Sequence, residues 1–265
     1  MVKDNICVIV PVHSANPSST ELKSLRQCAA ILRGYDVFLI FPSKIDVTLY
    51  KREYEKLILC PVNENWLSSI ENYNKMKCSL EFYNLFKKYS YLLTYELDSF
   101  IFSDDWDTAN VFDYDYIGAP WFHNNNKIGG VGNSGFSFRN VKQCIAVLEA
   151  INGVRKIWSV FSKLHLHRLF KLTILLNLVN PIWNKKGKNI NFYRLLSSDH
   201  LNEDLFWSYI IPDLFNFKVA PLKDAIKFSF ELNPSELFKL NNSRLPLGCH
   251  AWNKYDPEFW IPFIP

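Results

Sequence analysis

Apolar and polar positions alternate with two different periods along the first part of the chain. Short apolar runs of strand length are separated by longer segments in which apolar residues recur every three or four positions, as on one face of a helix. Strands are predicted over residues 6–12, 35–41, 56–60 and 91–95, and helices over residues 20–32 and 70–89. This alternation is typical of βαβ units, and it predicts an α/β fold with a mostly parallel central sheet flanked by helices.

The first apolar run, from Ile6 to Val12, is rich in β-branched residues and contains no charged position. A strand without a polar face is expected at the centre of a sheet, where both faces are buried. A polar loop over residues 13–19 follows, and Thr20 with Glu21 then opens a helix that Gly34 closes.

Two carboxylates, Glu96 and Asp98, follow the fourth predicted strand directly. Ligands of open α/β sheets bind beyond the carboxyl ends of the strands, and two acids one residue apart can face the same side. Such a pair can hold Mg²⁺ or Mn²⁺ and, through the cation, a diphosphate. An acidic pair in an ordinary surface turn is the alternative.

A glycine-rich segment follows at residues 129–139, with four glycines in the seven positions 129–135. Glycines at this density suit a loop whose backbone comes close to a ligand. A hairpin with bulges is the alternative. The sequence contains neither GxxxxGK[ST] nor a strand-linked GxGxxG, so a phosphate group is expected to be held by metal.

Further candidate residues lie in the second half of the chain. Glu203 and Asp204 enter an apolar helix, where either acid could take a proton from a hydroxyl as general base, or simply stabilise the helix N-terminus. His250 stands in the non-periodic segment 247–252, and its imidazole could bind a metal or serve a structural role.

Composition narrows the class of protein. A length of 265 residues fits one α/β domain, and a net charge of +4 does not indicate nucleic-acid binding. The aromatic content of 16% suits either a sugar-stacking cleft or a bulky core. The six cysteines are far apart with no CxxC pair, which predicts free thiols in a reducing cytoplasm.

Neither a signal peptide nor a membrane-spanning helix is expected. The run 6–12 is too short and poorly flanked for a signal peptide, and no segment reaches the roughly 20 apolar residues that a span requires. We therefore predict a cytoplasmic protein that can still bind the inner face of a membrane.

Residues 151–198 contain nine lysines or arginines and no acid. Within residues 154–172 the apolar positions recur at helical spacing with cations between them, as in helices that lie on an anionic bilayer. We predict a basic helical insertion over 151–198, with 154–172 as the membrane-binding part. A helical hairpin that only covers the domain is the alternative.

Taken in order, these segments resemble the GT-A glycosyltransferases, particularly a bacterial family associated with surface polysaccharide synthesis. The resemblance spans roughly residues 5 to 255, apart from the basic middle. The residues that carry it are 95–100 (YELDSF), 115–121 (DYIGAPW), 132–139 (GNSGFSFR), 203–204 (ED) and 248–252 (GCHAW).

The resemblance implies a single GT-A domain over residues 1–265, a nucleotide-sugar donor that is first of all a UDP-sugar, and a Mn²⁺ or Mg²⁺ ion. Donor-side residues implied in this way are Pro11, Val12, His13, Ser14, Glu96 and Asp98. Metal ligands would be Glu96, Asp98 and His250. Acceptor-binding residues would be Trp121, Asn133, Ser134, Gly135 and Trp252. Asp204 would face the acceptor as the catalytic carboxylate that accepts its proton, with Glu203 beside it as a second catalytic candidate.

Two positions depart from the family pattern. Glu96 replaces the first aspartate of the usual triplet, which leaves open whether it binds the metal directly or contacts the ribose. Ser134 replaces an expected glycine, which would change the fit of the acceptor.

The reaction expected from the resemblance is transfer of the donor sugar to a hydroxyl of a saccharide or a lipid-linked acceptor. Inversion is favoured, because a well-placed carboxylate base suits a single displacement. A metal-dependent nucleotidyltransferase or sugar-phosphate hydrolase is a second possibility. A non-enzymatic carbohydrate- or lipid-binding module is a third.

Overall fold

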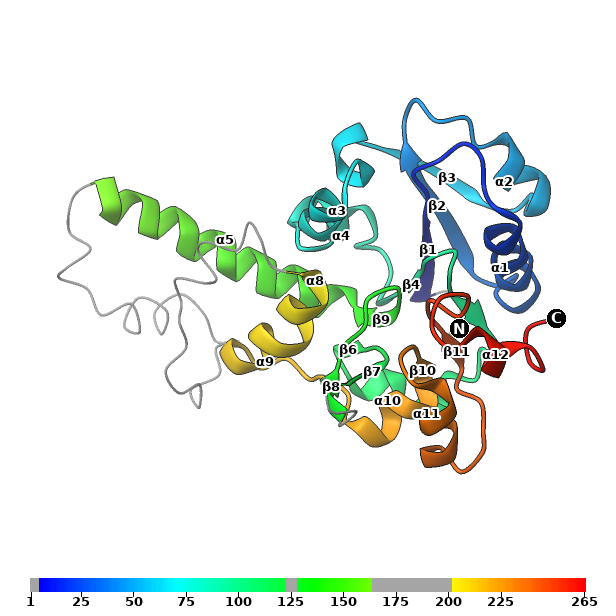
Figure 1. Cartoon of the computed structure of the whole chain (residues 1–265). Helices are drawn as coiled ribbons and strands as arrows, with labels where there is room; N and C mark the ends of the chain where they lie inside the picture. The colour runs from blue at the N-terminus through cyan, green and yellow to red at the C-terminus, as the bar shows by residue number, and fades with distance from the viewer. Residues whose placement is uncertain (1–4, 123–127, 164–201) are drawn as a thin grey trace.

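A six-stranded sheet forms the centre of the computed structural model, which describes residues 5–122, 128–163 and 202–265 (Figure 1). Its strand order is β3-β2-β1-β4-β9-β6. The first four strands run parallel, while β9 pairs antiparallel with both β4 and β6. The strands are β1 (Ile6–Pro11), β2 (Asp36–Pro42), β3 (Ile58–Val62), β4 (Tyr91–Tyr95), β6 (Tyr116–Ile117) and β9 (Phe136–Asn140). The predicted α/β class with a mostly parallel sheet is confirmed.

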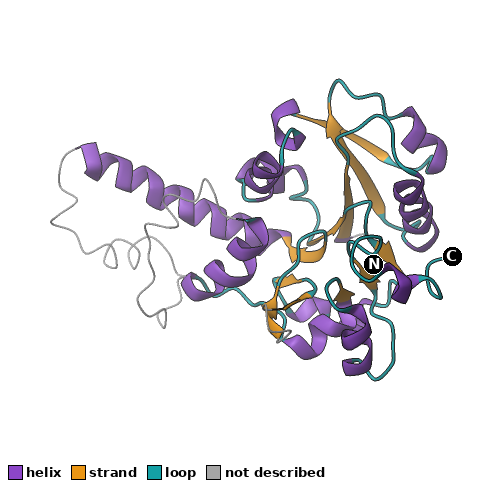
Figure 2. Cartoon of the chain, viewed as in Figure 1, coloured by secondary structure: helices purple, strands orange, loops and turns teal. Residues whose placement is uncertain are grey.

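Helices cover both faces of this sheet (Figure 2). Successive strand residues point to opposite faces, so Val8 of β1 packs in one core cluster and Ile9 in the other. Leu25 joins the first cluster, and Phe82 and Val147 join the second. The helices on the first face are α1 (Ser19–Ile31) and α2 (Thr48–Glu53). Those on the second face are α3 (Ile70–Lys77), α4 (Leu80–Leu85) and α5 (Val141–Lys163).

A second, three-stranded sheet lies beyond the carboxyl end of β4, in the order β10-β11-β5. β11 pairs antiparallel with β5, with Cys249 opposite Phe100. This pairing brings a C-terminal segment beside the turn that follows β4. The strands are β5 (Phe100–Ile101), β10 (Ser229–Phe230) and β11 (Gly248–Cys249), with helices α10 (Leu222–Phe228), α11 (Pro234–Leu240) and α12 (Pro257–Trp260) around them.

The glycine-rich segment joins a small hairpin to the main sheet. β7 (Pro120–Phe122) pairs antiparallel with β8 (Ile128–Val131), and the chain then turns over residues 132–135 into β9. Part of the segment is thus the hairpin considered above, and the turn over residues 132–135 brings its backbone against the residues that follow β4.

Most predicted elements are present with small shifts at their ends. The strands predicted over 6–12, 35–41 and 91–95 are β1, β2 and β4, and the strand predicted over 56–60 is β3, two residues further on. The first helix begins one residue before Thr20, because Ser18 and Glu21 form a capping box.

The single helix predicted over 70–89 is wrong. It is divided into α3 and α4, because the chain leaves the helix after Lys77 and Ser79 caps a new one. The Ser79 hydroxyl accepts a hydrogen bond from the Phe82 amide and donates one to the Met76 carbonyl. An apolar face that continues in register across the break conceals it from a periodicity argument.

The predicted basic insertion is described only at its beginning. α5 extends to Lys163, while residues 164–201, which hold most of the segment 151–198, lie outside the described residues. Among the helices that the structure describes, none combines the length and apolar character needed to cross a bilayer. All six cysteines are free, as predicted.

Candidate active site

The turn after β4 is held in place by the glycine-rich segment. The Glu96 amide donates a hydrogen bond to the Gly135 carbonyl at 2.9 Å, and the Ser99 hydroxyl donates to the same carbonyl at 3.1 Å. A further bond from the Ser99 amide to the Glu96 carbonyl, at 2.8 Å, closes the turn. The backbone that bears Glu96 and Asp98 is therefore fixed on both sides.

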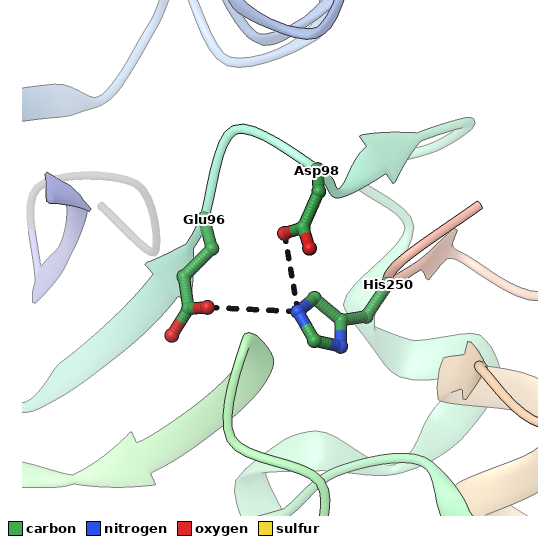
Figure 3. Close-up of side chains that lie close together, drawn as sticks. All are labelled: Glu96, Asp98 and His250. Carbon is green, nitrogen blue, oxygen red and sulfur yellow. Dashed lines mark ion pairs between the residues drawn. The ribbon is translucent and has the colours of Figure 1, made fainter. Parts of the chain in front are cut away.

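His250 reaches this turn because it follows β11, the strand that pairs with β5 (Figure 3). Its Nε2 lies 3.1 Å from Oδ1 of Asp98 and 3.5 Å from Oε2 of Glu96. One ligand atom from each of the three residues lies within 4.8 Å of the others. Two carboxylates and an imidazole at these separations are a suitable ligand set for Mn²⁺ or Mg²⁺.

Glu231 holds the His250 ring from behind. Oε1 of Glu231, a buried side chain, lies 3.0 Å from Nδ1 of His250. A carboxylate at Nδ1 fixes the ring and directs Nε2 towards the other two acids, which is the usual support of a metal-binding histidine. Burial would lower the pKa of His250, but hydrogen bonds with Asp98, Glu231 and Glu96 raise it well above its usual range. A cation would take the place of the Nε2 proton.

The His250 ring occupies the space where a side chain at position 135 would lie, and Gly135 leaves this space free. A Cβ atom at this position would lie 2.1 Å from Nε2 of His250, too close for any side chain. The glycine predicted to contact an acceptor thus also allows the histidine to approach the acidic turn.

Glu96 is held as a carboxylate by residues of α3. The Tyr73 hydroxyl donates a hydrogen bond to its Oε1 at 2.8 Å, and Nζ of Lys77 lies 3.8 Å from the same oxygen. Burial alone would raise the pKa of Glu96, but the hydrogen bond with His250 and the charge of Lys77, helped by Tyr73, lower it to about 2. Glu96 therefore has one oxygen engaged by α3 and the other facing His250.

A cavity of about 480 Å³ opens beside these acids, at the carboxyl end of β1. The residues that line it include all six of the donor-side residues expected from the sequence: Pro11, Val12, His13, Ser14, Glu96 and Asp98. Tyr50, Ile70 and Tyr73 supply apolar and aromatic surface. Of the described residues that line the cavity, three are carboxylates (Glu21, Glu96 and Asp98) and none is a lysine or arginine.

The two acids at the start of α8 (Glu203–Leu205) have different environments. Glu203 is fully buried in an ion pair with Arg139, with Nζ of Lys77 at 3.5 Å from its other oxygen. Asp204 is only partly buried, and burial together with the charge of Glu203 raises its pKa to about 6. The charge of Lys77 acts to lower the pKa of Asp204, and that of Glu231 acts to raise it. Only Asp204 is open enough to meet a substrate.

The expected acceptor residues divide into two groups. Asn133, Ser134 and Gly135 form the turn before β9, where Oδ1 of Asn133 accepts the Gly135 amide and Ser134 accepts two hydrogen bonds from Lys77. The hydrogen bonds that the structure shows for these three residues stabilise the turn itself.

The two tryptophans lie in different places. Trp121 stands against Gly132, where an added Cβ would be 2.9 Å from the ring and 2.6 Å from Cβ of Ser208, four residues after Asp204. Trp252 is instead packed against Phe100 and donates to the Ser24 hydroxyl, so its ring belongs to the core. Trp121 is the better candidate to contact an acceptor.

Sequence reasoning did not find Tyr73, Lys77 or Glu231. Tyr73 and Lys77 lie in a helix that reads as an ordinary amphipathic segment, and Lys77 would be expected at the surface. The sequence offers only a weak indication of Glu231, as an acid that directly follows the short strand β10.

A family model described as "Protein of unknown function (DUF5672)" matches residues 56–250, more than half of the chain. The chain belongs to this family. The matched region of this DUF5672 protein contains Glu96, Asp98, Glu203 and Asp204, and it ends at His250. No curated protein sequence matches the chain.

Solved structures with a similar fold include glycosyltransferases. Mouse xyloside xylosyltransferase 1 is 11% identical, with 92% of this chain and 96% of that chain covered and a TM-score of 0.47. The galactosyltransferase LgtC is 9% identical, with coverage of 92% and 86% and a TM-score of 0.44. The bifunctional glycosyltransferase WbbM is 10% identical with a TM-score of 0.46; 96% of this chain but only 47% of WbbM is covered. Likenesses of this strength do not assign an activity.

Proposed function

We propose that this DUF5672 protein is a metal-dependent glycosyltransferase. It moves a sugar from a nucleotide-sugar, with a UDP-sugar as first candidate, to a hydroxyl of a saccharide or lipid-linked acceptor in bacterial surface polysaccharide synthesis. The observation that supports this most is the meeting of Glu96 and Asp98 with the distant His250 beside the cavity lined by residues 11–14. The polysaccharide role rests on the sequence resemblance.

Asp98 and His250 would hold a Mn²⁺ or Mg²⁺ ion, with Glu96 as a third ligand through the oxygen that faces His250. A bound ion would supply positive charge to stabilise the departing diphosphate. Glu231 keeps Nε2 of His250 directed towards Glu96 and Asp98, and Tyr73 keeps Oε1 of Glu96 turned towards α3. These contacts fix the ligands before substrate arrives.

Asp204 is the proposed general base. A carboxyl group with a pKa of about 6 is ionised at neutral pH and is a stronger base than an ordinary aspartate. It takes the proton of the acceptor hydroxyl as that oxygen attacks the anomeric carbon, and the bond to the diphosphate breaks on the opposite side. This single displacement inverts the anomeric centre. Glu203, enclosed by Arg139 and Lys77, is not proposed as a base.

A nucleotidyltransferase and a non-enzymatic binding module fit less well. A nucleotidyltransferase binds a triphosphate, whose charge calls for lysine or arginine, and the described lining of the cavity contains neither. A binding module has no need for a histidine supported from behind by a buried carboxylate and facing two more.

The test is turnover of nucleotide-sugars by the purified protein. We expect release of the nucleotide from one member of a panel of UDP-, GDP- and CMP-sugars, in the presence of Mn²⁺ and stopped by a chelator. Asp98→Asn should abolish this release, while Asp107→Asn, an exposed acid in the following segment, should not change it. If no donor is consumed by the wild type with Mn²⁺, the proposal is wrong.

For the basic segment we propose binding to an anionic membrane surface through residues 154–172, on the cytoplasmic side. Arg155 and Lys156 lie on the described part of α5, and the charge between them and residue 172 is entirely positive. Flotation with vesicles should recover the protein with anionic lipid at low salt and lose it as salt rises. Equal recovery with neutral vesicles would contradict this.

A further inference from the structure

A fully buried lysine lies between the two halves of the candidate site. Lys77 is the last residue of α3, and its side chain has no exposed surface. Its ammonium donates to the Ser134 hydroxyl at 2.9 Å and to the Ser134 carbonyl at 3.2 Å. It also lies over the Tyr73 ring, 5.0 Å from the centroid. A lysine is almost never fully buried unless it is paired, so its partners indicate its role.

The partners of Lys77 come from different sides of the site. Nζ lies 3.8 Å from Oε1 of Glu96, on the metal side, and 3.5 Å from Oε2 of Glu203, on the acceptor side. Glu203 is also paired with Arg139, which is equally buried. Two carboxylates and two cations form this network, so its formal charges balance. Removing the lysine would leave Glu96 with one fewer cation and Ser134 without its donor.

A backbone carbonyl and a side chain of α3 reinforce this connection. The Trp207 indole donates a hydrogen bond to the Lys77 carbonyl at 3.1 Å, and the Glu203 amide donates to Oδ1 of Asn74 at 3.3 Å. Both ends of the segment that contains Asp204 are thus attached to the turn of α3 that presents the lysine. In this arrangement Asp204 has a fixed position relative to the Glu96 turn.

We propose that Lys77 is a positioning residue for transfer: it fixes the separation between the acidic metal-binding turn and the Asp204 segment, with the Ser134–Gly135 turn between them. This inference rests on the proposed function. Lys77 has no exposed surface, so it acts through Glu96, Glu203 and Ser134. A misplacement of about 1 Å between reacting groups can lower a rate on the order of 100-fold, so a small shift of α8 is enough to matter.

The experiment compares Lys77→Met with Lys75→Met, using the donor that the wild type consumes and an acceptor that it glycosylates. Lys75 is two residues away on the same helix, is exposed and forms an ion pair with Glu71, so its variant removes the same charge from the surface of α3. Three quantities are measured: kcat, the donor KM, and the ratio of transfer to acceptor over hydrolysis by water.

We expect Lys77→Met to lower kcat for transfer by about 10- to 100-fold. The donor KM should stay within about threefold, because Tyr73 and His250 still hold Glu96. The ratio of transfer to hydrolysis should fall, since water needs less exact placement than a sugar hydroxyl. Lys75→Met should match the wild type.

A purely structural role would reduce transfer and hydrolysis in proportion, as the active fraction of enzyme fell, and this result would overturn the inference. A kcat within twofold of wild type would overturn it as well. If Lys77→Met does not fold, Ser134→Ala replaces it, because this variant removes the hydroxyl partner of the ammonium without removing a charge. A lower ratio of transfer to hydrolysis in Ser134→Ala supports the inference, and an unchanged ratio overturns it. If the wild type consumes no donor, the proposed function itself fails and this inference with it.

Discussion

His250 is useful as a metal ligand only if its ring is held, and Glu231 is the residue that holds it. The carboxylate lies 3.0 Å from Nδ1, on the side of the ring away from Glu96 and Asp98. Without it the ring could turn, and Nε2 would become a weaker donor to the ion.

Glu231→Gln should therefore weaken Mn²⁺ binding by about 10- to 100-fold, as measured by titration of free Mn²⁺ with electron paramagnetic resonance. Glu236→Gln, which changes an exposed acid of α11 in the same way, is the matched control. An unchanged Mn²⁺ affinity in Glu231→Gln would show that His250 does not bind the ion.

A substitution at Gly135 tests the proposed metal site from the Nε2 side of the His250 ring, opposite to Glu231. Alanine would place Cβ 2.1 Å from Nε2, so the imidazole must move away from the acids. We expect Gly135→Ala to lose most of its Mn²⁺ affinity, while Gly130→Ala, whose Cβ would meet the Trp121 ring at 3.4 Å, keeps it. Equal affinities in the two variants would contradict the assigned geometry.

At the scale of single elements, α3 and α8 form the support of the site. The break between α3 and α4 matters here, because it ends α3 at Lys77 and lets the chain expose the Lys77 carbonyl to Trp207. α8 begins with two acids, of which Glu203 is buried and Asp204 is partly exposed. The partial burial of Asp204 lowers the stability of the fold, and this effect can be measured without any substrate.

The pKa of Asp204 is about 6 in the folded protein, above the ordinary value of 3.8. The folded state therefore holds this proton more tightly than the unfolded chain, and the fold loses stability as pH rises through this interval. We expect Asp204→Asn to melt at a higher temperature than wild type at about pH 7.5, and the difference to disappear as the pH falls below 3.8. Thermal unfolding at both pH values is the measurement.

The same ionisation should appear in the reaction. Transfer should decline below about pH 6 as Asp204 becomes protonated, and Asp204→Asn should lose transfer by about 10²- to 10⁴-fold while it still binds nucleotide. Near-wild-type transfer in this variant would remove Asp204 as the base.

At the scale of the whole molecule, the electrostatics of the cavity predict how nucleotide binds. Three carboxylates and no lysine or arginine are among the described residues of its lining. A diphosphate is repelled by such a surface unless a divalent cation neutralises it. We expect UDP to raise the melting temperature only when Mn²⁺ is present, with the rise growing with UDP concentration. An equal shift in chelator would show that phosphate is held by other groups.

Much of the fold could be predicted from local patterns. Apolar runs of strand length identified β1 to β4, and the two acids after β4 had to lie at the carboxyl edge of a parallel sheet, because all these strands end on one side. The periodicity missed the break after Lys77 because a local Ser79 cap makes it within a continuous apolar face. The burial of Lys77 could not be predicted from local patterns, because it depends on tertiary contacts with Glu96, Glu203 and Ser134.

The sequence by itself determined the α/β class, the position of Glu96 and Asp98 at a strand end, and the residue types available for metal and base. Tertiary structure decided which of them meet. The pairing of β11 with β5 brings His250 to the acids, β10 brings Glu231 behind it, and packing buries Glu203 fully while Asp204 stays partly open. Backbone periodicity reports how each segment meets the core, whereas contacts between distant segments depend on strand pairing and leave no repeating pattern along the chain.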